Sequence, residues 1–142
     1  MKIIIIGCGN IGQSHLKSFI SSKKYYEIDI IDNIKILKNL KSNYKINNNS
    51  ILNFYTNFPK NKKYDLAIIS TNSRERFLVF KKLVKKNKIK NLILEKFLFN
   101  KKKEYIDFSN LRRKKRIQNV RVNSWGEYVF SKLNIKLKKK EF

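Results

Sequence analysis

The chain has 142 residues, a formal net charge of +24, one Cys and one His. This length suits one ordinary domain and argues against a large multidomain enzyme. A disulfide scaffold and a zinc module are excluded by the Cys and His counts, so we expect no metal site. No apolar run approaches the ~20 residues that span a bilayer, and the opening MKIIII meets glycines too early for a signal peptide. We therefore expect a soluble, cytoplasmic protein with no membrane partner.

Lysine supplies most of the positive charge, with 28 Lys against 6 Arg. Lys, Asn and Ile make up 66 of the 142 residues, and all three have codons that can consist wholly of A and T. Drift in base composition would therefore explain the lysine excess, and readout of bases favours Arg, so nucleic acid is not the partner we favour. A field of this strength still attracts polyanions at low salt, and the run at residues 111–116 is the best candidate contact, with a solvated helix end as the other interpretation.

Short β-rich runs alternate with segments of helical length along the chain. In chain order, the patterns predict strand Lys2–Ile6, helix Ile11–Ser21, strand Tyr26–Asp32, helix Ile34–Tyr44, strands Ile51–Thr56 and Tyr64–Ser70, helix Ser73–Asn87, strand Asn91–Glu95, helix Lys101–Arg113, strand Asn119–Ser124 and an amphipathic helix Glu127–Lys140. This alternation implies right-handed βαβ crossovers. We therefore predict an α/β fold in a single domain, with a doubly wound parallel sheet of about six strands.

The first predicted helix has Ile11, His15 and Phe19 at i, i+4 and i+8, which places them on one face. We expect this face to point toward the sheet. On this basis His15, the only histidine, is a packed residue rather than a catalytic one.

A glycine motif follows the first strand and opens the first helix, in the order Gly7-Cys8-Gly9-Asn10-Ile11-Gly12. The first glycine of G-x-G-x-x-G allows a tight turn, the second lets backbone approach a pyrophosphate, and the third permits close packing of helix on strand. The N-terminus of the helix adds free N–H groups and a positive dipole. We therefore predict that Gly7, Gly9, Asn10, Ile11 and Gly12 bind the phosphates of a dinucleotide.

Asp32 ends the second predicted strand, 20 residues after Gly12. A carboxylate at this position accepts hydrogen bonds from the adenosine ribose and repels a 2′-phosphate. Asn33 follows and brings no compensating positive charge. The pair predicts NAD as the cofactor, with NADP less favoured.

Polar residues also follow the fourth predicted strand, at Thr71, Asn72 and Ser73. They could line the cofactor cleft, and we include Thr71 and Asn72 among the candidate cofactor-binding residues. They would equally form an N-cap for the helix that follows.

The sequence resembles the N-terminal domain of the Gfo/Idh/MocA oxidoreductase family over nearly its whole length. The resemblance rests on the glycine motif, on the strand that ends in Asp32, on the segment DLAIISTN at 65–72, and on Leu94-Glu95-Lys96-Phe97-Leu98, similar to the Glu-Lys-Pro signature of the family with Phe97 in place of Pro. It implies that Lys96 is the catalytic residue, beside the nicotinamide and the substrate hydroxyl, and that Glu95 helps to fix the turn at the cofactor.

The resemblance also implies a substrate region near the end of the sixth strand, at Asn123 and Trp125, although Trp125 could equally be a core aromatic. Members of the family carry a second domain that supplies substrate contacts, and nothing in these 142 residues corresponds to it. We therefore expect residues 1–124 to form a dinucleotide-binding Rossmann domain. Residues 125–142 would form a helix that starts the crossover to a missing second domain.

Two functions from different classes remain open at this stage. The first, implied by the resemblance, is an NAD-dependent oxidoreductase of carbohydrate metabolism that acts on a hydroxyl of a sugar, cyclitol or nucleotide sugar, incomplete as this chain. The second is a non-catalytic module that binds nucleotide or polyanion. Whether the chain is a fragment or a stand-alone module decides between them, and homo-oligomers are open if a second domain exists.

Overall fold

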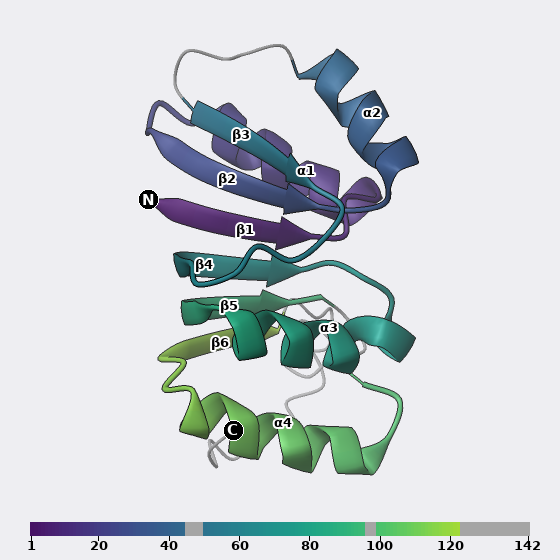
Figure 1. Cartoon of the computed structure of the whole chain (residues 1–142), viewed down its shortest axis with the longest axis vertical. Helices are drawn as coiled ribbons and strands as arrows, with labels where there is room; N and C mark the ends of the chain where they lie inside the picture. The colour runs from purple at the N-terminus through teal and green to yellow at the C-terminus, as the bar shows by residue number, and fades with distance from the viewer. Residues whose placement is uncertain (45–49, 96–98, 123–142) are drawn as a thin grey trace, which may run out of the picture.

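The computed structural model describes residues 1–44, 50–95 and 99–122. This part of the chain contains six strands and four helices (Figure 1). In chain order they are β1 (Lys2–Ile6), α1 (Asn10–Ile20), β2 (Tyr26–Ile31), α2 (Ile34–Asn43), β3 (Ser50–Tyr55), β4 (Lys63–Ile69), α3 (Ser73–Lys86), β5 (Lys88–Leu94), α4 (Lys102–Lys114) and β6 (Asn119–Val122).

The strands form one sheet in the order β3-β2-β1-β4-β5-β6, and every neighbouring pair is parallel. The predicted doubly wound parallel sheet is therefore confirmed. In Figure 1 all six arrows point the same way, so the carboxyl ends of the strands share one edge. The strand order changes direction between β1 and β4, which is where sheets of this kind bind their ligands.

The expected element ends are correct to within one residue, apart from those of β5 and β6. β5 begins at Lys88 rather than Asn91, because its first residues already pair with β4 through Lys63↔Lys88 and Tyr64↔Ile89. The last residues expected for β6 and the expected helix Glu127–Lys140 lie outside the described residues.

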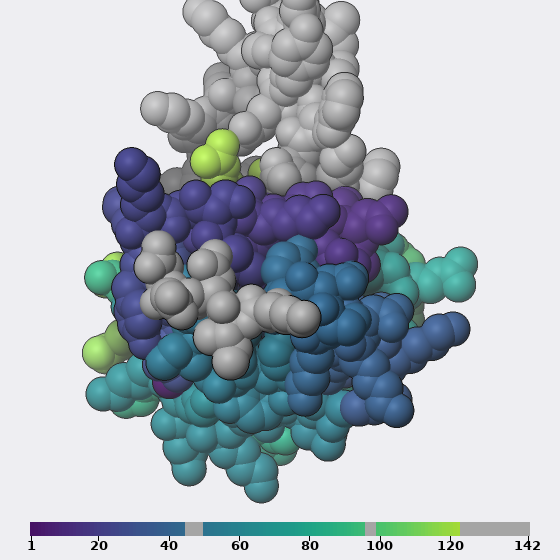
Figure 2. Space-filling model, turned by 90° about the horizontal axis from the view of Figure 1, so that it is seen from above, coloured from purple at the N-terminus to yellow at the C-terminus, as the bar shows by residue number. Residues whose placement is uncertain are grey.

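Each face of the sheet is covered by two helices, as its two hydrophobic clusters show. Leu16 of α1 and Leu37 of α2 pack with β1 and β2 in one cluster. Phe80 of α3 and Phe108 of α4 pack with β4 and β5 in the other. Seen from the β3 end, the purple surface of α1 and the teal surface of the segments after β3 lie on opposite sides of the molecule (Figure 2).

The inward face of α1 differs from the one expected. Gly12 and Leu16 are the buried residues of this helix, whereas Ile11 is 46% exposed and His15 is only half-buried. The i, i+4 spacing was correct, but the helix is rotated so that its close contact with the sheet falls on the glycine. Ile11 is therefore available to line a cleft.

Asp29 is an acidic side chain with no exposed surface in the middle of β2. It accepts hydrogen bonds from Lys62 Nζ at 2.8 Å, from Tyr64 Oη at 2.6 Å and from Asn53 Nδ2 at 2.9 Å. Burial alone would raise its pKa, but these three donors and the lysine charge outweigh burial and hold the pKa of Asp29 below its ordinary value. The network ties the connection between β3 and β4 to the sheet.

Candidate dinucleotide site

The carboxyl edge of the sheet brings together four segments that are distant in sequence. They are the turn after β1, the residue after β2, the turn after β4 and the residue after β5. Backbone hydrogen bonds join them, with the Gly7 amide donating to the carbonyl of Ile31 at 3.0 Å and the Ser70 amide to that of Ile6 at 2.8 Å. The turns are thus held by the strands on either side.

The turn after β1 is as tight as the glycine motif predicts. Gly7 has φ +85°, and a Cβ there would lie 2.9 Å from the amide nitrogen of Thr71. A Cβ on Gly12 would lie 2.0 Å from the carbonyl oxygen of Gly7, so only glycine lets α1 approach the strand this closely. A Cβ on Gly9 would meet no atom of the described residues within 4 Å, so these residues leave that side of the turn open to a ligand.

In the part of the chain that the structure describes, no side chain competes with an anion for the N-terminus of α1. Gly9 is the N-cap, and no side chain of that part caps the helix. The first turn holds no acidic residue, and Asn10 and Ile11 are both exposed. The amides and the dipole at this helix end therefore suit a phosphate.

The Asp32 carboxylate lies at this turn, as expected. Its Oδ2 accepts a hydrogen bond from the amide of Cys8 at 2.5 Å, and its Oδ1 accepts one from the amide of Asn33 at 2.7 Å. Each carboxylate oxygen has a second lone pair, so both remain able to accept from a ribose hydroxyl. The Asn33 side chain caps α2 instead, accepting from the amide of Ile36 at 3.0 Å.

Cys8 lies in the same turn, but its side chain is fully buried. Burial, with a smaller contribution from the Asp32 charge, raises the pKa of the Cys8 thiol to about 12. The thiol therefore stays protonated near neutral pH, and its contribution is to packing.

The turn after β4 forms the opposite wall of a cleft of about 350 Å³. The cleft contains four of the residues expected from sequence, and its lining is Ile11, Ser70, Thr71, Asn72, Ser73, Arg76 and Glu95. The hydroxyl oxygens of Ser70 and Thr71 are buried and have no hydrogen-bond partner among residues 1–44, 50–95 and 99–122. Unsatisfied buried hydroxyls are costly in a folded protein and fit a polar ligand placed between these walls. Asn72 caps α3 by accepting from the amide of Glu75 at 3.2 Å, so one of the two roles considered for it is confirmed.

Arg76 joins the two walls and was not found by sequence analysis. Its side chain is only 3% exposed, and it donates to the backbone carbonyl of Glu95 at 2.6 Å and to that of Thr71. Burial lowers the pKa of the guanidinium, and the nearby Glu95 charge opposes this effect. The spacing could have indicated that Arg76 is buried, because it lies four residues before Phe80, on the inward face of α3.

His15 reaches the same wall from α1. Its Nε2 lies 2.6 Å from Oε1 of Glu95, whose side chain is 3% exposed. The expected packed histidine is thus a half-buried partner of a carboxylate that lies 80 residues away in sequence. It links α1, which follows the glycine turn, to the end of β5.

Three predicted site residues, Lys96, Asn123 and Trp125, lie outside the described residues. Within residues 1–44, 50–95 and 99–122, no group of three or more His, Cys, Asp or Glu side chains could hold a metal ion. No helix of this part is long and apolar enough to cross a membrane.

The parallel sheet, the glycine turn, the free helix N-terminus and the carboxylate at the end of β2 define a dinucleotide-binding Rossmann domain. Residues 1–124 match the family described as an oxidoreductase family with an NAD-binding Rossmann fold. The chain therefore belongs to the Gfo/Idh/MocA oxidoreductase family, as the resemblance indicated. A search of curated proteins gives no significant match.

Solved structures show the same fold at low sequence identity. Scyllo-inositol dehydrogenase from Lactobacillus casei matches with a TM-score of 0.65 and 12% identity over 90% of this chain and 38% of its own. The WlbA dehydrogenase from Chromobacterium violaceum, in complex with NADH and UDP-GlcNAcA, matches with a TM-score of 0.64 and 14% identity over 84% of this chain and 34% of its own.

An NAD-binding protein from Listeria innocua matches with a TM-score of 0.63 and 12% identity, over 86% of this chain and 34% of its own. The chain thus spans little more than a third of the length of these three structures.

Proposed function

We propose that this chain is the cofactor-binding domain of an oxidoreductase that prefers NAD(H) to NADP(H). The observation that carries the preference is the Asp32 carboxylate, held by two backbone amides at the end of β2. Its charge would repel a 2′-phosphate, whereas its free lone pairs would accept from a ribose 2′-hydroxyl. No lysine among the described residues forms an ion pair with it.

The dinucleotide would lie along the carboxyl edge of the sheet, from the end of β2 to the cleft beside β4. Gly7, Gly9 and the first amides of α1 would hold the pyrophosphate. The cleft with the two unpartnered hydroxyls would take the nicotinamide half, and the Arg76 and Glu95 contacts would fix the distance between its walls. When bound, the cofactor supplies the hydride chemistry.

We further propose that the substrate is a sugar, cyclitol or nucleotide sugar. Two of the matched structures support this class, one by its name as an inositol dehydrogenase and one by its complex with UDP-GlcNAcA. Lys96 directly follows Glu95, which ends the cleft wall, and is proposed as the group that donates a hydrogen bond to the reacting oxygen. Asn123 and Trp125 are proposed as substrate contacts.

Calorimetric titration of the chain with NADH and with NADPH tests the cofactor preference. The wild type should bind NADH more tightly, and Asp32→Asn, which removes the charge and keeps a hydrogen-bond acceptor, should narrow the preference by about tenfold, or ~1.4 kcal/mol. Asp107→Asn on α4 removes the same charge away from the turn and should leave the preference unchanged. Equal or tighter binding of NADPH by the wild type would overturn the assignment.

A further inference from the structure

A groove runs between α3 and α4, and none of its lining residues belongs to the candidate dinucleotide cleft. It encloses about 370 Å³ and is lined by Leu78, Lys81, Lys82, Val84, Lys85, Leu111 and Lys115. The floor is apolar, and Leu78 is 54% exposed although it is a large aliphatic side chain. A neighbouring concavity of about 400 Å³ shares Val84, Lys85 and Lys115 with the groove and extends it along the amino edge of the sheet.

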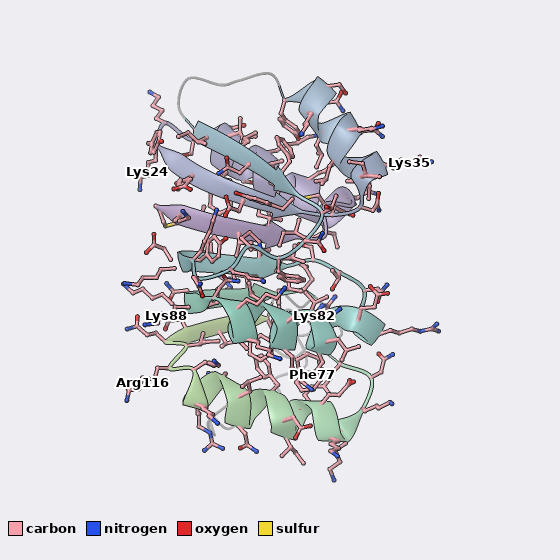
Figure 3. The ribbon with its side chains drawn as sticks, viewed as in Figure 1. Lys24, Lys35, Phe77, Lys82, Lys88 and Arg116 are labelled. Atoms are coloured by element: carbon pink, nitrogen blue, oxygen red, sulfur yellow. The ribbon has the colours of Figure 1, made fainter. Side chains whose placement is uncertain are left out.

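Lysines surround this surface, and no carboxylate of the described residues lines either concavity. The second concavity adds Lys62, Lys63, Lys86 and Lys88 to the rim. Within residues 1–44, 50–95 and 99–122 the lysines in ion pairs are Lys2, with Glu27, and Lys62, with Asp29. The other lysines of the rim therefore have no carboxylate partner in that part of the chain. Figure 3 shows Lys82 on α3, and Lys88 and Arg116 toward the amino edge of the sheet.

The helix dipole accounts for only part of this arrangement. Basic residues in the last turns of α3 and α4 stabilise those helices, and the acidic residues of the two helices lie in their first two turns. The dipole does not explain the mid-helix lysines Lys81 and Lys82. Nor does it explain Lys63 and Lys88, which are in register on adjacent strands, where like charges repel.

We propose that the groove binds an acidic amphipathic helix of a partner protein. α3 and α4 run in the same direction because both return from parallel strands, and the groove between two such helices accepts the ridge of a third. An apolar stripe on the incoming helix would cover Leu78 and the groove floor. Its acidic flanks would pair with the lysines of the rim, the arrangement of apolar centre and polar border seen at protein interfaces.

The charge of the rim and the apolar floor of the groove favour this occupant over three others. A second copy of the chain would also carry +24, so its approach would be repulsive. Residues 123–142 contain five Lys and two Glu, so this segment has the wrong sign for a lysine-rimmed groove. A nucleic-acid backbone would use the lysines but would leave Leu78 uncovered, since phosphates gain nothing from an apolar floor.

The test uses a labelled peptide of about 18 residues, long enough for five helical turns, with Leu along one face and Glu on both flanks. A scrambled peptide of the same composition and a short DNA duplex serve as competing probes. All titrations use about 0.15 M salt, so that non-specific electrostatic attraction between the basic protein and an acidic probe is screened. The groove variant is Lys82→Glu/Lys85→Glu/Lys115→Glu. The matched control is Lys17→Glu/Lys24→Glu/Lys38→Glu, which makes the same change in net charge at exposed positions. These three lysines lie on α1, in the turn before β2 and on α2, respectively.

The proposal expects the groove variant to lose at least tenfold in peptide affinity and the control less than threefold. Leu78→Ser, at an exposed position, should also lose about fivefold or more for the peptide and leave DNA binding unchanged. Equal losses in the two triple variants, equal binding of the scrambled peptide, or tighter binding of DNA with no effect of Leu78→Ser would each overturn the proposal. Circular dichroism of every variant confirms that the fold is retained. None of these residues lines the candidate dinucleotide cleft, so every variant should bind NADH as the wild type does, and the NADH titration tests the proposed function separately from the peptide titration.

Discussion

Replacing Arg76 with Met tests whether one buried side chain holds both walls of the candidate cofactor cleft. Met keeps most of the volume but removes the donors to the carbonyls of Thr71 and Glu95. A buried polar group that loses its partner costs about 1–3 kcal/mol, so two such carbonyls predict a loss of about 2–6 kcal/mol in the free energy of unfolding. NADH affinity should fall as well, because the two walls would no longer be tied together.

Urea denaturation followed by circular dichroism measures the first effect. With a urea dependence of about 2 kcal/mol per M, the midpoint should fall by about 1–3 M. Arg74→Met is the matched control, since Arg74 is exposed two residues earlier on the same helix and its loss should change stability by less than about 0.5 kcal/mol. If Arg76→Met keeps both the wild-type midpoint and the wild-type NADH affinity, the assigned role of Arg76 is wrong.

Four further predictions follow from the described contacts and from the family. Lys62→Met should cost about 3 kcal/mol in urea denaturation because it leaves Asp29 buried without its cation, whereas exposed Lys63→Met should cost little. Because the pKa of Asp29 is lowered on folding, its stabilising contribution should be complete above the ordinary Asp pKa and should disappear as pH falls through the folded value, which unfolding curves measured from pH 7 to 3 can check. Gly12→Ala should weaken both folding and NADH binding, since its Cβ would lie 2.0 Å from a carbonyl oxygen of the turn, and unchanged affinity would contradict that geometry. The 142-residue chain should bind NADH yet oxidise polyols or nucleotide sugars very slowly, because these residues contain nothing that corresponds to the substrate-binding domain of the family. Loss of general acid–base catalysis alone typically lowers the rate ~10²–10⁴-fold. Steady NADH production that Lys96→Ala abolishes would show that this chain is sufficient for catalysis.

The order and type of the elements could be predicted from the sequence because the signals for them are local. The aliphatic run of β1, the glycine motif directly after it and the acidic residue after β2 are spaced as the βαβ unit requires, so the turn and Asp32 were placed correctly. The parallel sheet followed from the alternation of strands and helices, since such crossovers have one hand. These features depend on neighbours within about 30 residues along the chain.

The composition of the cleft wall was decided by tertiary structure. His15 and Glu95 meet across 80 residues of sequence, and no local pattern relates them. A rotation of α1 by part of a turn exposes Ile11 and buries Gly12, because the helix approaches the sheet most closely where it lacks a Cβ. Arg76 is buried because the carbonyls of two turns converge on it once β4 and β5 are paired. Spacing along the chain shows which residues share a face, but only the packed sheet determines what that face meets.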